Sequence, residues 1–206
     1  MSDFGHQSAA GLVELHRHLD GSLRPETVRE LARENGLVVP GDLLFWPAMG
    51  LAEALSRFSF TLSLLQTPSA VSRVAHEMCD DATAEGIDAL EIRFAPQLHQ
   101  QGSMESIVDA AIEGCAGRAG LILCGLYGEP PERLNTLVDL GVSRRGVVGV
   151  DLAGGPAPDN RWQMSDYVEP FSRAKRAGLG VTIHAGEGRP ADEIRFAVER
   201  LGASRI

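Results

Sequence analysis

The sequence predicts an α/β protein with a parallel sheet of the (β/α)8 barrel type, containing about five βα units and the start of a sixth strand. Short apolar segments rich in β-branched residues alternate with amphipathic helical segments, a pattern typical of a parallel sheet covered by helices. Polar residues such as Arg93 and Asp151 come at the carboxyl ends of the short segments, where a barrel places its chemistry. A doubly wound nucleotide-binding sheet is the competing architecture, but neither Gly-x-Gly-x-x-Gly nor Gly-x-x-x-x-Gly-Lys-Ser/Thr occurs.

The first half of the chain predicts one strand and three helices. A strand over 12–18 precedes a helix over 25–36. This helix begins with a proline and an acidic residue and ends at a glycine. An irregular insertion over 38–50 leads to a helix over 51–65, whose large apolar residues recur at helical spacing. A helix over 67–85 follows, with a threonine as its N-cap and a proline as its first residue.

In the second half, we expect each helix to end at a glycine, which tolerates the left-handed conformation that follows many helices. The segment 147–150 is apolar on consecutive residues, as strands buried on both faces tend to be. The predicted strands are 87–94, 121–126, 147–152 and 181–184, and the predicted helices are 103–119, 131–140 and 165–177, ended by Gly120, Gly141 and Gly178.

Composition excludes several classes of function. The chain has 206 residues and a net charge of −9, which argues against nucleic acid as a partner. No apolar run approaches the roughly 18 residues that span a bilayer, and the N-terminal residues lack the features of a secretory signal. The cysteines are Cys79, Cys115 and Cys124, an odd number without Cys-x-x-Cys spacing, so we expect reduced thiols and a cytoplasmic location.

His16 and His18 form a His-x-His pattern at the end of the first strand. Because side chains alternate along a strand, both imidazoles point to one side, about 7 Å apart along the chain. They suit a single metal ion; the alternative is one histidine satisfied in the structure and one in solvent. A second strand ends in His184, with Glu187 three residues further on, and this favours the metal site.

Three histidines from two strand ends suit zinc, which keeps one position for water in catalytic sites. Zinc lowers the pKa of that water toward neutrality and so provides a hydroxide nucleophile. Glu187 is placed to donate a proton to a substrate nitrogen and later to take one back. The alternative for Glu187 is a carboxylate at the start of a helix that Pro190 would begin.

Four segments together resemble the motifs of the adenosine deaminase family. They follow one another in order, at suitable spacing, and span nearly the whole chain. The four are His16–Ser22 with Arg24–Thr27, Glu91–Pro96, Val150–Gly154 and His184–Glu187.

The resemblance implies a single metallo-dependent hydrolase barrel domain over 1–206 that deaminates adenosine or a related 6-aminopurine compound and releases ammonia. It implies Zn²⁺ as the cofactor, held by His16, His18 and His184. Glu187 would protonate a purine ring nitrogen while hydroxide attacks the carbon that carries the amino group. The expected partner is thus a small purine nucleoside, with no nucleic acid and no membrane; the oligomeric state stays open.

For the substrate, the resemblance implies contacts with His18, Asp20 and Gly154. Asp20 would bond a sugar hydroxyl, and Gly154 would offer its backbone amide to a second ring nitrogen. An insertion and lid region over 38–66, with the aromatic residues Trp46, Phe58 and Phe60, would cover part of the site.

The segment after Cys124 departs from the family pattern. The family often continues with a Met-Arg-His-like segment, whereas this chain has Gly125-Leu126-Tyr127-Gly128-Glu129. The exact amine therefore stays open among adenosine, adenine, aminodeoxyfutalosine and N6-methyl-AMP, and a non-catalytic fragment is the alternative of another class. The absence of Pro-Cys-x-x-Cys excludes the cysteine-ligated cytidine and nucleic-acid deaminases. His6, His76 and His99 match no motif, and we expect them to be surface or structural residues.

The end of the sequence repeats the pattern of a helix, a glycine and a strand, at Gly202 and the residues that follow. A (β/α)8 barrel needs about 250 residues, and the resemblance implies a later Gly-His-Gly segment and an Asp-Asp pair that this sequence does not contain. We therefore expect the chain to be the N-terminal part of a longer polypeptide or a truncated reading of its gene. On its own we expect it to be inactive and to bind zinc weakly.

Overall fold

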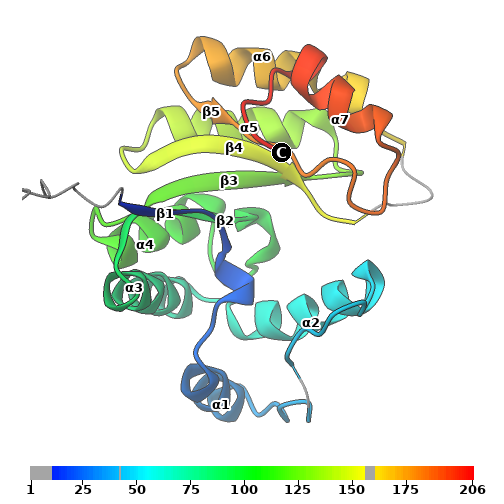
Figure 1. Ribbon diagram of the computed structural model, residues 1–206. Helices are drawn as coiled ribbons and strands as arrows, with labels where there is room; N and C mark the ends of the chain where they lie inside the picture. The colour runs from blue at the N-terminus through cyan, green and yellow to red at the C-terminus, as the bar shows by residue number, and fades with distance from the viewer. Residues whose placement is uncertain (1–10, 42, 156–160) are drawn as a thin grey trace, which may run out of the picture.

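The computed structural model describes residues 11–41, 43–155 and 161–206, and among these it contains one parallel sheet. The five strands lie side by side in the order in which the chain makes them, as Figure 1 shows. Sequential order is that of a barrel wall, whereas a doubly wound sheet reverses its order at a switch point. The predicted α/β architecture of barrel type is confirmed. The strands are β1 (Leu12–His18), β2 (Ile87–Phe94), β3 (Gly120–Leu126), β4 (Val147–Ala153) and β5 (Gly180–Val181).

The start of a sixth strand lies beside β5. Thr182 and Arg205 form an isolated parallel bridge. The Ser204 amide donates to the Val181 carbonyl at 3.0 Å, and the Ile183 amide donates to the Arg205 carbonyl at 3.3 Å. The predicted repetition of the pattern at the end of the sequence is thus present in the structure.

The helices cover the sheet in the order that a barrel requires. Helix α5 contacts β3 and β4, α6 contacts β4 and β5, and α3 contacts β2 and α4. Figure 1 shows α5 and α6 together on one side of the sheet, and α3 and α4 together near β1 and β2. The helices α1 and α2 contact each other and project below the sheet, where α2 contacts the turn Leu19–Gly21 that follows β1. The helices are α1 (Pro25–Glu34), α2 (Leu51–Leu64), α3 (Pro68–Ala84), α4 (Met104–Cys115), α5 (Pro131–Val142), α6 (Val168–Arg176) and α7 (Asp192–Phe196).

The N-terminus of α3 is built as its sequence predicts. Thr67 is the N-cap, and its side-chain oxygen accepts a hydrogen bond from the Ala70 amide at 3.2 Å. Pro68 follows at the first helical position, where its missing N–H costs nothing.

Two predicted helix ends were wrong. The helix expected to reach residue 119 ends at Cys115, because Ala116 (φ 49°) and Gly117 (φ 77°) both adopt the left-handed conformation. Gly120 is then the first residue of β3. Gly141 does not end α5, which continues to Val142. A Cβ at Gly141 would lie only 3.0 Å from Leu179, so this glycine serves close packing.

Three further expectations needed correction. The segment 165–177 divides into a 3-10 turn over Met164–Tyr167 and the helix α6. The strand predicted over 181–184 keeps regular pairing only over Gly180–Val181, although the His184 amide still donates to the Leu152 carbonyl of β4. Val148 is 42% exposed, so β4 is not buried on both faces along its whole length.

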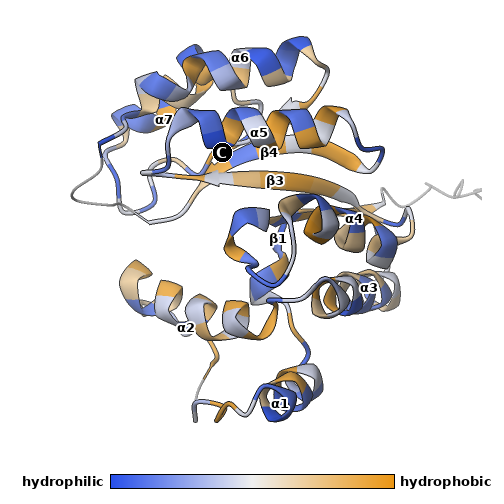
Figure 2. Ribbon diagram, turned by 180° about the vertical axis from the view of Figure 1, so that it is seen from behind, coloured by the Kyte–Doolittle hydropathy of each residue, from blue (hydrophilic) through white to orange (hydrophobic). Residues whose placement is uncertain are grey.

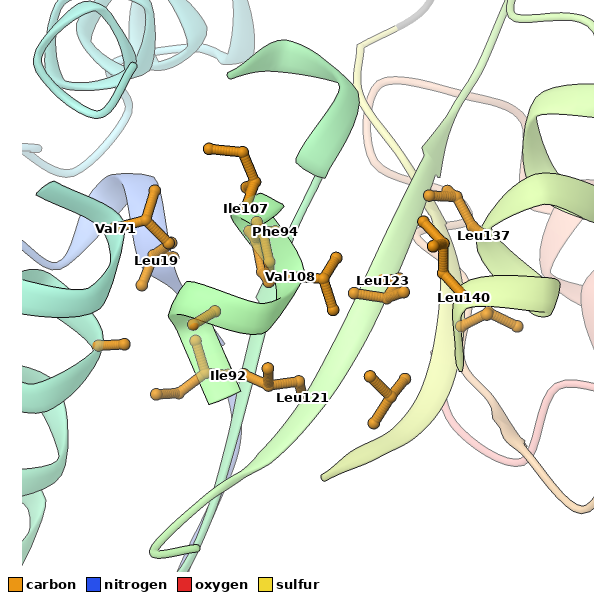
Figure 3. Close-up of a cluster of buried hydrophobic side chains, with 14 of the residues drawn as sticks. Leu19, Val71, Ile92, Phe94, Ile107, Val108, Leu121, Leu123, Leu137 and Leu140 are labelled. Carbon is orange, nitrogen blue, oxygen red and sulfur yellow. The ribbon is translucent and has the colours of Figure 1, made fainter. Parts of the chain in front are cut away.

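The hydrophobic core lies between the sheet and its helices. Figure 2 shows β3 and β4 as hydrophobic ribbons, and shows helices in which hydrophobic and hydrophilic residues alternate. Figure 3 shows part of this core, where Val108 of α4 lies beside Leu123 of β3. Within the described ranges, no helix combines the length and apolar character that crossing a membrane requires.

Candidate metal centre and cavity

His16, His18 and His184 meet at the carboxyl edge of the sheet. The first two come from the end of β1, and His184 comes from the extended segment after β5. The Nε2 atom of His184 lies 3.0 Å from that of His16 and 3.2 Å from that of His18, and the remaining pair lies 3.3 Å apart. Histidines separated by 166 residues of sequence therefore direct the same ring nitrogen at one point.

This triangle has the dimensions of a metal site. Zinc binds histidine nitrogen at about 2.0–2.1 Å, and tetrahedral angles then separate two nitrogen ligands by about 3.3 Å. The observed separations of 3.0 to 3.3 Å are close to that value. In the described part of the chain, these three residues form the one group of histidine, cysteine or carboxylate side chains with metal-site spacing.

The environment keeps the two β1 histidines neutral, which is the form that binds a metal. Burial and then the positive charge of Arg93 lower the pKa of His16 to about 4. Burial and then the neighbouring His184 lower the pKa of His18 to about 3. Both imidazoles thus present a free lone pair at neutral pH.

The other ring nitrogen of His184 faces a buried carboxylate. His184 Nδ1 lies 2.9 Å from Asp151 Oδ2, in an oblique contact that is not aligned as a hydrogen bond. A carboxylate at this place can accept the Nδ1–H of a metal-binding histidine, which would then fix the orientation and tautomer of the ring. Burial raises the pKa of Asp151, but the contact with His184 and the charge of Arg93 outweigh it, so the net pKa is lowered and Asp151 stays ionised.

Arg93 completes this arrangement from β2. Its Nη1 donates to Asp151 Oδ2 at 2.9 Å and to Thr182 Oγ1 at 3.2 Å, and its Nη2 donates to the Leu15 carbonyl at 2.8 Å. Arg93 is 1% exposed and Asp151 is fully buried. The sequence places both residues at strand ends, but their pairing was not predicted, because nothing in a sequence shows which strand ends become neighbours.

The histidines line a cavity of about 710 Å³. Asp20, Gly154 and Glu187 also line it, so the structure brings all the predicted site residues to one place. The remaining wall is mostly apolar and consists of Phe45, Leu51, Ala54, Leu55, Phe58, Ser59, Leu62, Phe94, Ala95, Leu98, Cys124, Leu126, Ala153, Ala185 and Ile206.

Asp20 is one of the polar residues that line the cavity. Its Oδ1 atom is buried and accepts no hydrogen bond within the described chain. Burial raises the pKa of this carboxyl to about 6, although a hydrogen bond from its own backbone opposes the shift. Glu187, by contrast, is exposed, and it lies before the first turn of α7 rather than in it.

The segment 38–66 supplies one wall of the cavity. Phe58 lines it, with its ring centroid 5.8 Å from that of His18. Phe60 instead packs against the core, and Trp46 lies under the guanidinium of Arg57 at 4.4 Å. Of the three aromatic residues considered, Phe58 is the one in contact with the cavity.

The other described histidines and the cysteines lie away from the metal centre, with one exception. His99 is buried against the Leu65 carbonyl, His76 is exposed beside Asp80, and His6 lies outside the described residues. All three cysteines are free and buried. The exception is Cys124, whose sulfur lies 3.6 Å from Asp151 Oδ2 and lines the cavity.

A parallel sheet in sequential order, with a convergent histidine cluster at its carboxyl edge, defines a barrel-type α/β protein with a candidate metal centre. The family model for adenosine deaminase matches residues 11–206. The chain belongs to the adenosine deaminase family, whose named members are enzymes.

Two curated relatives illustrate the similarity. An adenosine deaminase from Clostridium perfringens is 35% identical and one from Shewanella halifaxensis is 34% identical; each match covers 94% of this chain and 64% of the relative. This chain therefore spans less than two thirds of the length of these relatives.

Solved structures show the same architecture. An adenine deaminase from Arthrobacter aurescens superposes with a TM-score of 0.80 at 25% identity, covering 96% of this chain and 64% of its own. An N6-mAMP deaminase from Arabidopsis superposes with a TM-score of 0.77 at 28% identity, covering 92% and 63%. The described part of this chain thus corresponds to part of the barrel in those proteins.

Proposed function

We propose that the chain forms, over 1–206, the zinc-binding portion of a barrel-type hydrolase that deaminates adenosine or a related 6-aminopurine compound and releases ammonia. The observation that carries this proposal is the convergence of His16, His18 and His184 on one point at an apolar cavity. Membership of the adenosine deaminase family supports the reaction type. The buried, reduced cysteines agree with a cytoplasmic location, which we include in the proposal.

His16, His18 and His184 would hold Zn²⁺ through Nε2, with Asp151 behind His184. When bound, zinc supplies Lewis-acid activation of a water molecule. Glu187 would give a proton to a purine ring nitrogen and take one back, since it lines the same cavity and is reachable from solvent. Gly154 would offer its backbone amide to another ring nitrogen.

Asp20 favours a nucleoside over a free base as the substrate. Its buried Oδ1 lacks a partner in the described chain, and a ribose hydroxyl would supply the missing hydrogen bond. An adenine deaminase and an Arabidopsis ADAL complexed with IMP are among the structural neighbours, so adenine and adenine nucleotides remain alternative substrate classes. Aminodeoxyfutalosine is a further alternative, because the segment after Cys124 departs from the common family pattern.

The metal is tested by elemental analysis of the purified chain and of His184→Ala, with His76→Ala as the matched control. We expect a measurable zinc content of up to one equivalent in the wild type and the control, and none in His184→Ala. Retention of zinc by His184→Ala would overturn the metal assignment.

The substrate is tested by calorimetric titration of the zinc-loaded chain with adenosine, adenine and AMP, and by assay of ammonia release in the full-length enzyme. We expect adenosine to bind most tightly and Asp20→Asn to weaken adenosine more than adenine. If adenine binds at least as tightly as adenosine, or if Asp20→Asn weakens both equally, the nucleoside assignment is wrong.

A further inference from the structure

The segment 184–189 contains both a proposed metal ligand and the proposed proton-transfer residue, and its backbone makes few hydrogen bonds. Gly186 (φ 83°) and Gly188 (φ 64°) flank Glu187 and both adopt the left-handed conformation. Glycine gives a chain high conformational freedom. No backbone amide of residues 185–189 donates to a backbone carbonyl within the described chain, and Glu187 makes no hydrogen bond or ion pair there.

Tyr127 contacts this segment at both of its ends. Its hydroxyl donates a hydrogen bond to the His184 carbonyl at 2.7 Å. Its ring lies under the guanidinium of Arg189, whose carbon is 4.1 Å from the ring centroid. These contacts lie three residues before Glu187 and two residues after it. The side chain of Tyr127 therefore restrains the backbone on both sides of Glu187.

Both partners in this arrangement are themselves held. Tyr127 is 7% exposed, and it follows β3 in the part of the sequence that departs from the common family pattern. Arg189 forms a bidentate pair with Glu193, through its Nε and through its Nη2 at 2.8 Å, and Glu193 lies in the first turn of α7. The ring of Tyr127 and the first turn of α7 thus enclose Arg189 from two sides.

We propose that Tyr127 is a positioning residue that fixes the segment 184–189, and with it His184 and Glu187, at the cavity. This inference rests on the proposed roles of those two residues. The proposal also assigns a function to the segment after Cys124, where the sequence differs from the common family pattern. This segment places Tyr127 at the end of β3, from where it holds residues 184–189.

Tyr167 provides a matched control, since the sequence contains two tyrosines. Tyr167 is 1% exposed, and its hydroxyl donates to the Glu129 carbonyl at 2.7 Å and lies 3.4 Å from the Leu126 carbonyl. It therefore holds the same loop as Tyr127 but makes no hydrogen bond to the segment 184–189. Replacement of either tyrosine by phenylalanine removes one buried hydroxyl and keeps the ring.

The experiment compares Tyr127→Phe, Tyr167→Phe and the wild-type chain by two measurements. The first is zinc affinity, by competition with a chelator. The second is the rate at which a glutamate-specific protease cuts after Glu187, relative to its cut after Glu34 at the end of α1. Proteolysis follows the population of the open form, so the ratio reports local mobility of the segment and does not depend on catalysis.

Loss of one buried hydrogen bond corresponds to a change of roughly 2- to 10-fold in a local equilibrium. We expect Tyr127→Phe to weaken zinc binding and to speed the cut after Glu187 by such factors. We expect Tyr167→Phe to change both quantities less, because Tyr167 acts on the segment only through the loop that carries Tyr127. An unchanged relative rate of cutting in Tyr127→Phe, or an equal rise in both variants, would overturn the proposal. If the relative rate rises but no protein binds zinc, the positioning inference stands and the proposed metal function fails.

Discussion

Replacement of Arg93 by methionine is expected to destabilise the chain more than any change at its surface. Methionine fills much of the space of the arginine stem but leaves the fully buried Asp151 without the hydrogen bond and charge of Arg93. The change also removes the hydrogen bonds to Thr182 Oγ1 and to the Leu15 carbonyl. Breaking a buried pair by removing one partner costs about 3–5 kcal/mol, against a total stability of about 5–15 kcal/mol for a typical domain.

A second variant separates the charge from the packing. In Arg93→Met/Asp151→Leu both charges are gone, and replacement of a buried pair by apolar residues is often close to neutral. We therefore expect the double variant to regain about 2 kcal/mol or more of the loss, in line with a coupled pair. The surface control is Arg176→Met, because Arg176 and Glu169 are each 66% exposed and such pairs contribute about 0–1 kcal/mol.

Urea unfolding followed by circular dichroism measures these differences, with the slope of the transition checked for each variant. A loss below about 1 kcal/mol in Arg93→Met would refute the reasoning, because that is the range of an exposed pair. The reasoning would also be refuted if the loss of stability in the double variant equalled the sum of the losses in Arg93→Met and in Asp151→Leu, because Arg93 and Asp151 would then act independently.

Three further predictions follow from the site and its support. Asp151→Asn removes the carboxylate beside His184 Nδ1, and we expect zinc affinity to fall about 10- to 100-fold in chelator competition; an unchanged affinity would show that the contact is incidental. Glu187→Gln in the full-length enzyme should retain zinc but lower the rate of ammonia release about 10²- to 10⁴-fold, and near-normal turnover would remove Glu187 from the mechanism. Gly114→Ala places a Cβ 2.2 Å from the Ser72 carbonyl oxygen between α3 and α4, so we expect the free energy of unfolding in urea to fall by about 1–3 kcal/mol. Gly117→Ala is the comparison for backbone strain alone, because the structure leaves open space there but φ is 77°.

The sequence predicted the sheet well because its strands carry two independent signals. Apolar β-branched runs mark the strands, and the polar residues that follow them mark which end faces the cavity. Helix ends were less predictable, since glycine serves two different needs. Gly178 (φ 85°) ends its helix by a left-handed conformation, whereas Gly141 lies inside α5 and allows Leu179 to approach. Local sequence does not distinguish these two uses.

The candidate site was predicted as a list of residues, and the structure adds the contacts among them. Alternation along β1 put His16 and His18 on one side, the end of a second predicted strand added His184, and the family resemblance supported all three as ligands. Their approach to within 3.3 Å depends on how far the sheet curves between β1 and β5, which is a tertiary property. The contacts of Tyr127 depend in addition on the path of the segment 184–189, which has no regular secondary structure to predict.

The buried pair of Arg93 and Asp151 links the sheet to the metal centre. Arg93 comes from β2 and donates hydrogen bonds to the Leu15 carbonyl of β1 and to Asp151 of β4. Asp151 in turn faces His184, which lies beyond β5. The guanidinium of Arg93 thus contacts β1, which carries His16 and His18, and Thr182, which lies two residues before His184. A charge in the interior is costly unless it is paired, so the pair is stable only when these strands take their native register. The same interactions that are needed to bury Arg93 therefore hold the histidines in the geometry that suits a metal ion.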